Sequence, residues 1–427
     1  MSEFKVWDFV DATLVAQEGR DPRASRTPSV WPSEASADRI DKTEANIVGT
    51  CHRKSYGRMV GWPITNTIDP IGAWRFVSGR LIENYLTGLA QATNPKIYMA
   101  SGIRHYVNDI YLPFELDLVV KDPETNKGWI VECKTIYGYF ARKEIITEGK
   151  PKLEHIMQVA LYLLEIKNGK RMKEIINAGF AERFAREARL LAAGKEVTED
   201  RNRIKIADPA EIAKMDDGCI GAKLLYFTRD ECDRKEFNIT VEEDFDGSFY
   251  PVVDGMMWKT FTVESIYERY KTLQNFWFVA RAEAERRLEA KGVLPPSTLR
   301  LVRGRGDQPP DLDELTQTPE EKKAEQDYLI RLERETASLP IEFWPPAEYS
   351  WAFTPEKIEM LFQNNLIGKK KYDDWKKKKK GADRIGDWQC LYCPFKKQCV
   401  PKQNPNWAYA LYDMDDMIPV EQLGREG

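Results

Sequence analysis

The chain has 427 residues, enough to bury one large core or two ordinary ones, and its 42% hydrophobic and 31% charged residues are typical of a globular protein in water. The formal net charge is −4, so any contact with nucleic acid must rest on local basic patches. No apolar run approaches the ~20 residues that cross a bilayer, and the first twenty residues lack the basic start of a secretory signal. Seven cysteines, an odd number, favour a reducing cytoplasm over a disulfide framework.

The N-terminal part of the chain predicts an arm followed by two helices. Residues 1–45 contain a Pro/Ser-rich stretch, which is typical of a loop or extended arm. Residues 43–60 predict a helix that contains Cys51. A second helix is predicted over 74–92, where the apolar residues share one face: Phe76, Leu81, Ile82, Tyr85 and Leu89.

Three short strands are predicted next, at 105–112, 114–121 and 127–135, because each is rich in β-branched and aromatic residues that alternate with polar ones. A helix over 155–169 ends at an Asn-Gly pair, and a further strand is predicted over 222–230. The order helix, three strands, helix, strand places the chain in the α/β class.

Large helical additions are predicted around this core domain, which spans 46–250. The stretch 165–218 is a polar helical insertion within it. One long amphipathic helix at 260–292 dominates a helical region over 251–350, and the Pro-rich stretch 293–320 is the best linker candidate. The last region, 351–427, contains a helix, a lysine run and three closely spaced cysteines.

Asp117 and Glu132 interrupt two apolar strands that we expect to be antiparallel neighbours, so their side chains can converge. Lys134 lies two residues after Glu132, and strand alternation puts the pair on one face and Cys133 on the other. Paired carboxylates suit Mg²⁺ or Mn²⁺, and a lysine beside them can activate water for phosphodiester hydrolysis. Glu-x-Lys alone is also common on solvated strand faces, so the combination carries the signal.

Gln158 and Tyr162 are four residues apart and therefore neighbours on one face of the helix 155–169. A polar surface residue beside a core tyrosine is the simpler interpretation of such a pair. Apolar residues surround Gln158, however, and a buried amide needs hydrogen-bond partners.

The RecB-type branch of the PD-(D/E)xK nuclease superfamily has motifs that resemble six residues of this chain in the same order: Glu83, Asp117, Glu132, Lys134, Gln158 and Tyr162. The resemblance covers about 45–245 and implies a restriction-endonuclease-like αβββαβ core. Asp117 and Glu132 would be metal ligands, assisted by Glu83, and Lys134 the catalytic lysine. Gln158 and Tyr162 would form the family's Q-xxx-Y motif, which contacts DNA or orders the site. Two positions depart from the pattern, because many relatives have His in place of Glu83 and glycine in place of Glu115.

Cys390, Cys393 and Cys399 place three thiols in one segment, and a tetrahedral metal site needs a fourth ligand. Spacing alone fits either zinc or an iron–sulfur cluster. One cysteine before a RecB-type core and C-x₂-C-x₅-C after it is similar to the pattern of the AddB-like helicase-nucleases and the CRISPR-associated RecB-like exonucleases. This resemblance implies a structural [4Fe–4S] cluster with Cys51 as the fourth ligand. The other cysteines fit buried thiols without ligands: Cys133, Cys219 and Cys232.

Lysines interleaved with aromatic residues lie just before the last cysteines and inside their loop. Phosphate neutralisation combined with base stacking is what a single-strand channel uses. A solvated lysine-rich face is the alternative interpretation. The candidate DNA contacts are Lys369, Lys370, Lys371, Trp375, Lys376, Lys377, Lys378, Lys396 and Lys397.

We therefore expect a Mg²⁺- or Mn²⁺-dependent exonuclease that acts on single-stranded DNA or DNA ends, with 5′→3′ polarity by resemblance only. The resemblance also implies a bacterial or bacteriophage role in recombination, repair or DNA processing, in the bacterial or host cytoplasm and with a protein partner in such a complex. Two alternatives stay open: a structure-specific endonuclease, and a non-catalytic nucleic-acid-binding protein that retains the fold.

Overall fold

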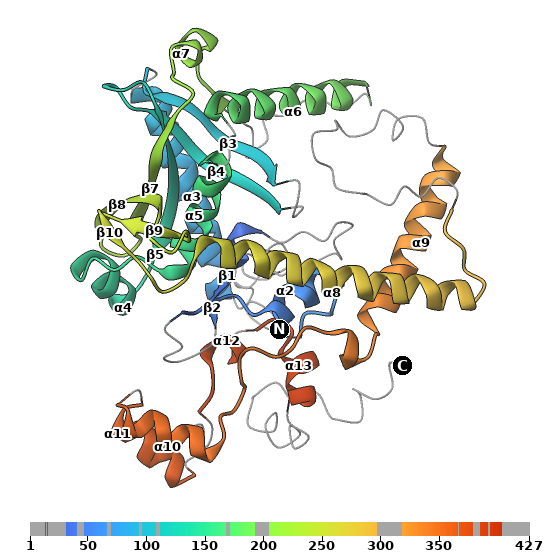
Figure 1. Cartoon of the computed structure of the whole chain (residues 1–427). Coiled ribbons are helices and arrows are strands. Elements are labelled where there is room, and N and C mark those ends of the chain that lie inside the picture. The colour runs from blue at the N-terminus through green and yellow to red at the C-terminus, as the bar shows by residue number, and fades with distance from the viewer. Residues whose placement is uncertain are drawn as a thin grey trace, which may run out of the picture.

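A mixed α/β fold built on one large sheet makes up the described part of the chain (Figure 1). Most of the arm 1–45 and of the linker 293–320 lies outside the described residues. The computed structural model describes residues 13, 15, 31–40, 47–65, 70–93, 96–107, 112–167, 171–192, 205–296, 318–365, 367–378, 385–391 and 393–403.

The large sheet has eight strands in the order β10-β9-β8-β7-β5-β4-β3-β6. The β5–β7 pair is parallel, because a long crossover separates the two strands, and the other described pairs are antiparallel. Its strands are β3 (Tyr98–Val107), β4 (Leu112–Lys121), β5 (Gly128–Ile136), β6 (Lys205–Ile206), β7 (Cys219–Thr228), β8 (Arg234–Glu243), β9 (Phe249–Val253) and β10 (Met256–Met257). A separate two-stranded sheet pairs β1 (Ser36–Asp38) with β2 (Ile47–Gly49).

Helices surround the sheet and extend from it toward the C-terminus. They are α2 (His52–Met59), α3 (Pro70–Thr93), α4 (Tyr139–Arg142), α5 (Leu153–Lys167), α6 (Met172–Ala192), α7 (Pro209–Ala213), α8 (Val263–Ala290), α9 (Pro319–Ala337), α10 (Pro355–Gln363), α11 (Lys369–Lys376), α12 (Trp388–Leu391) and α13 (Lys396–Gln403). The short helical turns are η1 (Pro32–Glu34), η3 (Lys143–Thr147) and η5 (Ile341–Phe343).

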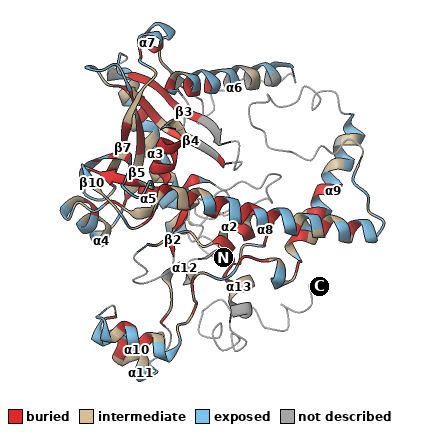
Figure 2. Ribbon diagram, in the orientation of Figure 1, coloured by how far each residue is buried: buried red, intermediate tan, exposed pale blue. Residues whose placement is uncertain are grey.

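The core lies mainly on the face of the sheet that α5 and α8 cover. Ala160 of α5 and Ile266 of α8 belong to one large buried cluster with Ile130 of β5. On the opposite face, Ala90 of α3 packs in a smaller cluster with Val131. Figure 2 shows the buried residues along the strands, whereas exposed residues mark the outer sides of the helices.

The predicted helix over 74–92 is present as α3, but its predicted apolar face does not point to the core. Exposed residues include four of the five that define that face: Phe76, Leu81, Tyr85 and Leu89. Small residues face the sheet instead, among them buried Ala73, and a Cβ added at Gly79 would lie 3.1 Å from Thr135 Oγ1 of β5. The helix thus approaches the sheet closely and leaves its large apolar residues outside.

The predicted helix over 43–60 is wrong in its first half. Ile47–Gly49 forms strand β2, and Cys51 is the residue before the helix α2, not a residue inside it. Gly49 has a φ of 88°, and a Cβ at this position would lie 2.2 Å from Ala35 O, so the backbone there cannot continue a helix. The chain must turn at Gly49 to pair β2 with β1.

The predicted order helix, three strands, helix, strand is present as α3, β3, β4, β5, α5 and β7. The first strand begins earlier than predicted, at Tyr98, and residues 108–111 of the predicted 105–112 strand lie outside the described part. The hairpin strands β8, β9 and β10 were not predicted at all. The insertion 165–218 is helical, with α6 and α7, and also adds the edge strand β6.

Candidate active site and cysteine cavity

Four of the predicted site residues form one hydrogen-bonded chain across β5 and α5. The Lys134 ammonium donates to Glu132 Oε1 at 2.6 Å, and Gln158 Nε2 donates to the same oxygen at 2.8 Å. Gln158 Nε2 also donates to the Tyr162 hydroxyl at 2.7 Å. Glu132 is only 1% exposed, so these donors replace the water that a carboxylate otherwise needs. The predicted pairing of Gln158 with Tyr162 on one helix face is confirmed.

Asp117 lies where β4 and β5 separate. The last paired residues of the ladder are Leu118 and Val131, and beyond them the Asp117 carboxylate accepts the backbone N–H of Cys133 at 2.8 Å. Burial, and then the neighbouring carboxylates of Glu132 and Glu83, hold the pKa of Asp117 well above its usual range. The parting of two strands therefore makes room for an acidic cluster at the sheet.

Glu83 joins the cluster from α3, on the far side of the strand. Burial and the charge of Glu132 raise the pKa of the Glu83 carboxyl, and Lys134 opposes this effect. The pKa of Lys134 is also raised, because the attraction of Glu132 and Asp117 outweighs the cost of burial. Four of the six predicted residues are thus joined by hydrogen bonds, and the carboxyl groups of Asp117 and Glu83 lie close enough for charges in the network to affect their pKa values.

Cys133 packs away from this network, as strand alternation predicts. Its side chain contacts a small apolar cluster that contains Val131 and Leu118. Burial and the adjacent carboxylates hold the pKa of the Cys133 thiol well above its usual range. Cys133 is therefore a protonated packing residue between two members of the acidic site.

The acidic cluster contains carboxylates, the type of ligand that a hard divalent cation prefers. Three carboxylates are opposed by the single ammonium of Lys134, and two buried oxygens, Glu132 Oε2 and Gln158 Oε1, have no hydrogen-bond partner. Across the described residues, no three His, Cys, Asp or Glu side chains gather closely enough to hold a metal ion, and the partners of Glu132 are Lys134 and Gln158. Unpaired buried oxygens with excess negative charge favour a cation.

A cavity of about 410 Å³ is lined by Glu83 and Lys134 of the cluster and by three charged residues of β8, Arg234, Lys235 and Glu236. The two basic residues come from an unpredicted hairpin strand, so the sequence analysis did not identify them. They add positive charge to the lining of a cavity that also contains the carboxylates of Glu83 and Glu236.

His155 and Tyr226 extend the network behind Lys134 and were also missed. His155 Nδ1 and the Tyr226 hydroxyl are 2.7 Å apart, and the same hydroxyl accepts the Lys152 backbone N–H. Burial, together with the positive charges of Lys134 and Lys152, holds the pKa of His155 well below its usual range. A neutral imidazole therefore supports this end of the site.

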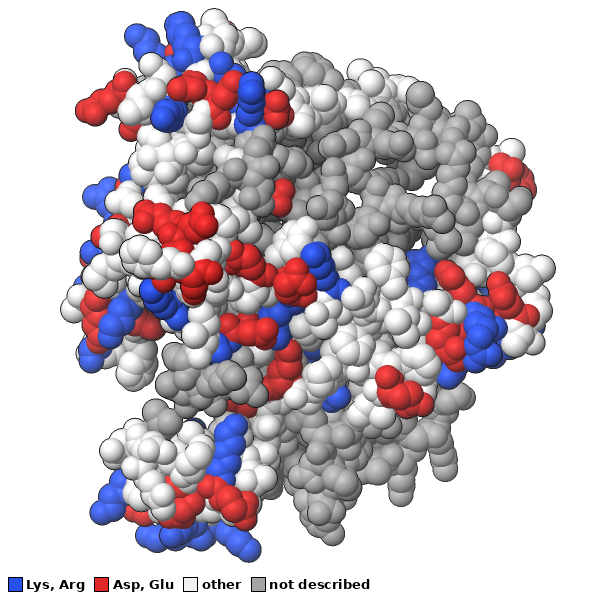
Figure 3. All heavy atoms as spheres, viewed as in Figure 1, with Lys and Arg blue, Asp and Glu red and all other residues white. Residues whose placement is uncertain are grey.

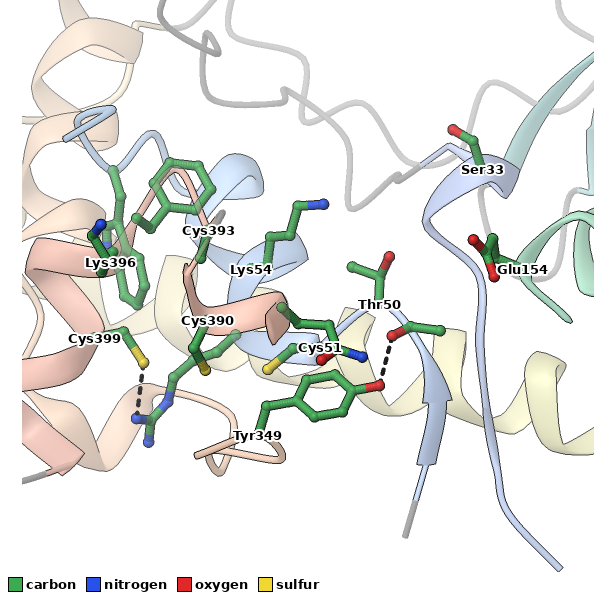
Figure 4. Close-up of a pocket in the computed structure, with 15 residues that line it drawn as sticks. Ser33, Thr50, Cys51, Lys54, Glu154, Tyr349, Cys390, Cys393, Lys396 and Cys399 are labelled. Atoms are coloured by element: carbon green, nitrogen blue, oxygen red, sulfur yellow. Dashed lines mark hydrogen bonds between the residues drawn. The ribbon is translucent and has the colours of Figure 1, made fainter. Parts of the chain in front are cut away.

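The four cysteines predicted as ligands line a second cavity, of about 300 Å³, far from the acidic cluster in sequence (Figure 4). Cys51 is the N-cap residue of α2, Cys390 belongs to α12, and Cys399 to α13. The Arg53 guanidinium donates to Cys399 Sγ at 3.5 Å. Residues more than 300 positions apart thus share one cavity, as the sequence predicts.

The thiols of this cavity affect one another. Burial raises the pKa of Cys390, and the neighbouring thiols of Cys399, Cys51 and Cys393 raise it further. Burial raises the pKa of Cys393 to about 11. Thiolates are soft metal ligands, but among the described residues these four thiols do not gather closely enough to form a metal site.

Several contacts outside the thiols hold the two chain segments together. Thr65 N donates to Pro394 O at 2.8 Å, and the Tyr349 hydroxyl donates to Gly49 O at 2.8 Å. The Glu348 carboxylate accepts the His52 backbone N–H at 2.8 Å and caps the start of α2. These backbone and side-chain contacts join the N-terminal and C-terminal segments around the cysteine cavity.

The predicted lysine patch lies mainly on α11, which packs with α10 around a small cluster that contains Ile358 and buried Tyr372. Trp375 is partly buried in that cluster. Figure 3 shows Lys and Arg side chains along the outer edge of this lobe. Lys396 differs, because it is 6% exposed and lies over the Trp351 ring, which removes it from any surface patch.

Comparison with protein-family models, with curated proteins and with solved structures finds no match for this chain. Within the described residues, no helix has both the length and the apolar character needed to cross a membrane.

Proposed function

We propose that the chain is a Mg²⁺- or Mn²⁺-dependent nuclease with a RecB-like PD-(D/E)xK core, and that it degrades single-stranded DNA from an end. The observation that carries this proposal is the convergence of Glu83, Asp117, Glu132 and Lys134 at the point where β4 and β5 separate. The order α3, β3, β4, β5, α5, β7 supports it as well.

Asp117 and Glu132 would hold the cation, with Glu83 as an additional oxygen donor. A bound divalent cation would lower the pKa of a water molecule and offset phosphate charge. Gln158, held by Tyr162, fixes the orientation of Glu132 through its amide hydrogens. The neighbouring carboxylates raise the pKa of the Lys134 ammonium despite its burial, and this group would orient or activate the attacking water and stabilise phosphate charge.

Incubation with Mn²⁺ and labelled single-stranded DNA, linear or circular, tests the proposal. Release of mononucleotides or short products from linear DNA alone supports an exonuclease. Cutting of circles would replace it with an endonuclease. Binding without cleavage of either substrate would contradict the enzyme and leave a non-catalytic binding protein.

Lys134→Ala should lower the cleavage rate by roughly 10²–10³-fold, the usual effect of removing one donor that stabilises a transition state. Single-turnover cleavage of the linear substrate measures the loss. Lys150→Ala is the matched control, because Lys150 is an exposed lysine whose ion pair with Glu148 lies outside the cluster. Equal rates for the two variants would remove Lys134 from the mechanism.

We further propose that Cys51, Cys390, Cys393 and Cys399 hold a [4Fe–4S] cluster with a structural role. Their shared cavity and the mutual effect on the pKa of Cys390 support four ligands of one group. Purified protein should absorb near ~400 nm and contain iron. Colourless protein with stoichiometric zinc would establish the alternative metal.

A further inference from the structure

Three exposed aromatic side chains follow the acidic strand directly. Tyr137, Tyr139 and Phe140 are 56%, 67% and 83% exposed, although rings of this size are usually buried. Gly138, with a φ of 91°, turns the chain outward between the end of β5 and α4. The rings of Tyr139 and Phe140 meet edge to face, with centroids 5.5 Å apart.

Two arginines flank the first of these rings. The guanidinium carbons of Arg75 and Arg229 lie 5.4 and 5.7 Å from the centroid of Tyr137. Arg229 is held in place, because its Nη1 donates to Arg75 O at 2.6 Å and to Ser78 Oγ at 2.9 Å. Two guanidiniums, one of them held by hydrogen bonds, thus lie close to the exposed Tyr137 ring.

The positive charge of this pair is not cancelled by an ion pair. In the described part of the chain, neither Arg75 nor Arg229 contacts a carboxylate, although Asp230 lies nearby and accepts the Gly138 backbone N–H at 3.1 Å. Arg142, in contrast, is paired with Asp233. We call Arg75, Arg229, Tyr137, Tyr139 and Phe140 the aromatic platform.

The aromatic platform lies along the same helix and strand as the acidic site. Arg75 contacts Tyr137, Gly79 meets Thr135 one turn later, and Glu83 lines the cavity with Lys134 one turn after that. Arg75 and Glu83 are eight residues apart on α3, about 12 Å at 1.5 Å per residue. A polymer held at the platform would therefore reach the carboxylates within a few monomer units.

We propose that the aromatic platform binds single-stranded nucleic acid, with unpaired bases stacked on its rings and the arginines neutralising phosphates. Stacking on aromatic and guanidinium planes requires unpaired bases, so a duplex would not fit. A protein partner could also bury the rings, but it would have to supply acidic groups for the two guanidiniums, which have no carboxylate partner among the described residues. The inference rests on the proposed nuclease function for its purpose, but binding can be measured without cleavage.

The test measures fluorescence anisotropy of a 20-nucleotide oligo(dT) and of its duplex with oligo(dA), in EDTA. Wild-type protein should prefer the single strand. The double variant Tyr137→Ala/Phe140→Ala should bind the single strand roughly tenfold or more weakly, since stacking contributes substantially for each base. The single variant Tyr137→Trp keeps a stacking surface at this position and leaves Phe140 in place, so it should bind the single strand as the wild type does.

Phe245→Ala is the matched control, because Phe245 is a fully exposed aromatic residue on the turn between β8 and β9 and has no arginine partner among the described contacts. Unchanged affinity in the platform variant, or an equal loss in the control, would overturn the inference. So would a change in oligomeric state without a change in DNA affinity, which would identify a protein interface. Wild-type binding without Mn²⁺-dependent cleavage would contradict the nuclease proposal alone.

Discussion

Gln158 illustrates how a single side chain can hold a charged site in place. Its amide nitrogen donates to both Glu132 and Tyr162, whereas its oxygen has no partner. The same group therefore orients a buried carboxylate and offers an additional buried acceptor. Its surroundings in the sequence are apolar, which is why it could be recognised as a candidate before the structure was considered.

Gln158→Ala should lower the free energy of unfolding by about 1–3 kcal/mol, because Glu132 and Tyr162 each lose a buried donor. Urea denaturation followed by circular dichroism measures the change. Gln363→Ala, at the exposed end of α10, should stay within about 0.5 kcal/mol. If both variants have the same stability, Gln158 does not support Glu132.

His155 gives a prediction for the dependence of stability on pH. Its pKa in the folded state is well below the usual value near 6.5, so the unfolded chain binds a proton that the folded protein does not. Stability should therefore be present above pH 6.5 and be lost as the pH falls below it, with a contribution from this group of at most roughly 1.4 kcal/mol per pH unit.

His155→Asn should flatten this dependence between pH 7 and pH 5 in melting experiments. The chain has three histidines, and the variant differs from the wild type only at His155. His52, whose pKa is about 4, therefore contributes equally to the pH dependence of both proteins. Parallel pH profiles for the two proteins would contradict a buried neutral His155.

At the residue scale, the sequence was informative where a charge interrupts an apolar strand, as at Asp117 and Glu132. The sequence does not predict contacts between residues that are distant along the chain. Arg229 and Tyr137 carry no local signal of their stacking, because both read as ordinary residues at the ends of strands. Such pairs depend on the parallel register of β5 and β7, which no local pattern specifies.

Among the elements, α8 links the sheet to the segment that carries the cysteines. Arg269 on α8 pairs with Glu348 at 2.5 Å and with Asp38 of β1 at 3.0 Å, and it also donates to Ser36. Glu348 in turn caps α2. Three segments from distant parts of the chain therefore meet at one guanidinium that is 7% exposed.

Arg269→Met should destabilise the protein by about 3–5 kcal/mol, since it leaves Glu348 buried without its cation. Urea unfolding measures the loss. Arg286→Met is the matched change on the same helix, where an exposed pair with Glu283 should contribute less than about 1 kcal/mol. Equal effects would show that the buried pair does not join these elements.

Helices with a strong hydrophobic periodicity, such as α5 and α8, were predictable from the sequence. Segments whose secondary structure depends on backbone conformation were less predictable. The sequence predicts helix at β2, because three residues are too few to show the alternation of a strand. The positive φ of Gly49, which ends the strand, leaves no mark in the sequence pattern. The face of α3 was misjudged for a different reason. Small residues pack against the sheet, so the larger apolar residues gave the wrong side.

At the scale of the molecule, the cysteine cavity joins both ends of the described chain. Cys51→Ser and Cys399→Ser should each lower the melting temperature and the ~400 nm absorbance, and the double variant should lose no more than one single variant. Serine is a good residue before a helix, so Cys51→Ser does not itself weaken α2.

Cys232→Ser is the control for this comparison, because Cys232 is exposed and distant in sequence from the four ligands. The Cys232→Ser variant should have the ~400 nm absorbance and the melting temperature of the wild type. Additive losses in the Cys51/Cys399 double variant would mean that the two thiols do not serve one cluster.

The separation of Arg53 and Cys399, 346 residues, also has a consequence for biosynthesis. At about 5–20 residues per second, a ribosome needs roughly 17–70 s to deliver the second residue after the first. The segment that supplies α12 and α13 to the wall of the cavity is therefore synthesised after the strands of the sheet and after α8. A chain truncated before residue 390 would contain every residue of the acidic site but would lack three of the four cysteines that line the cysteine cavity.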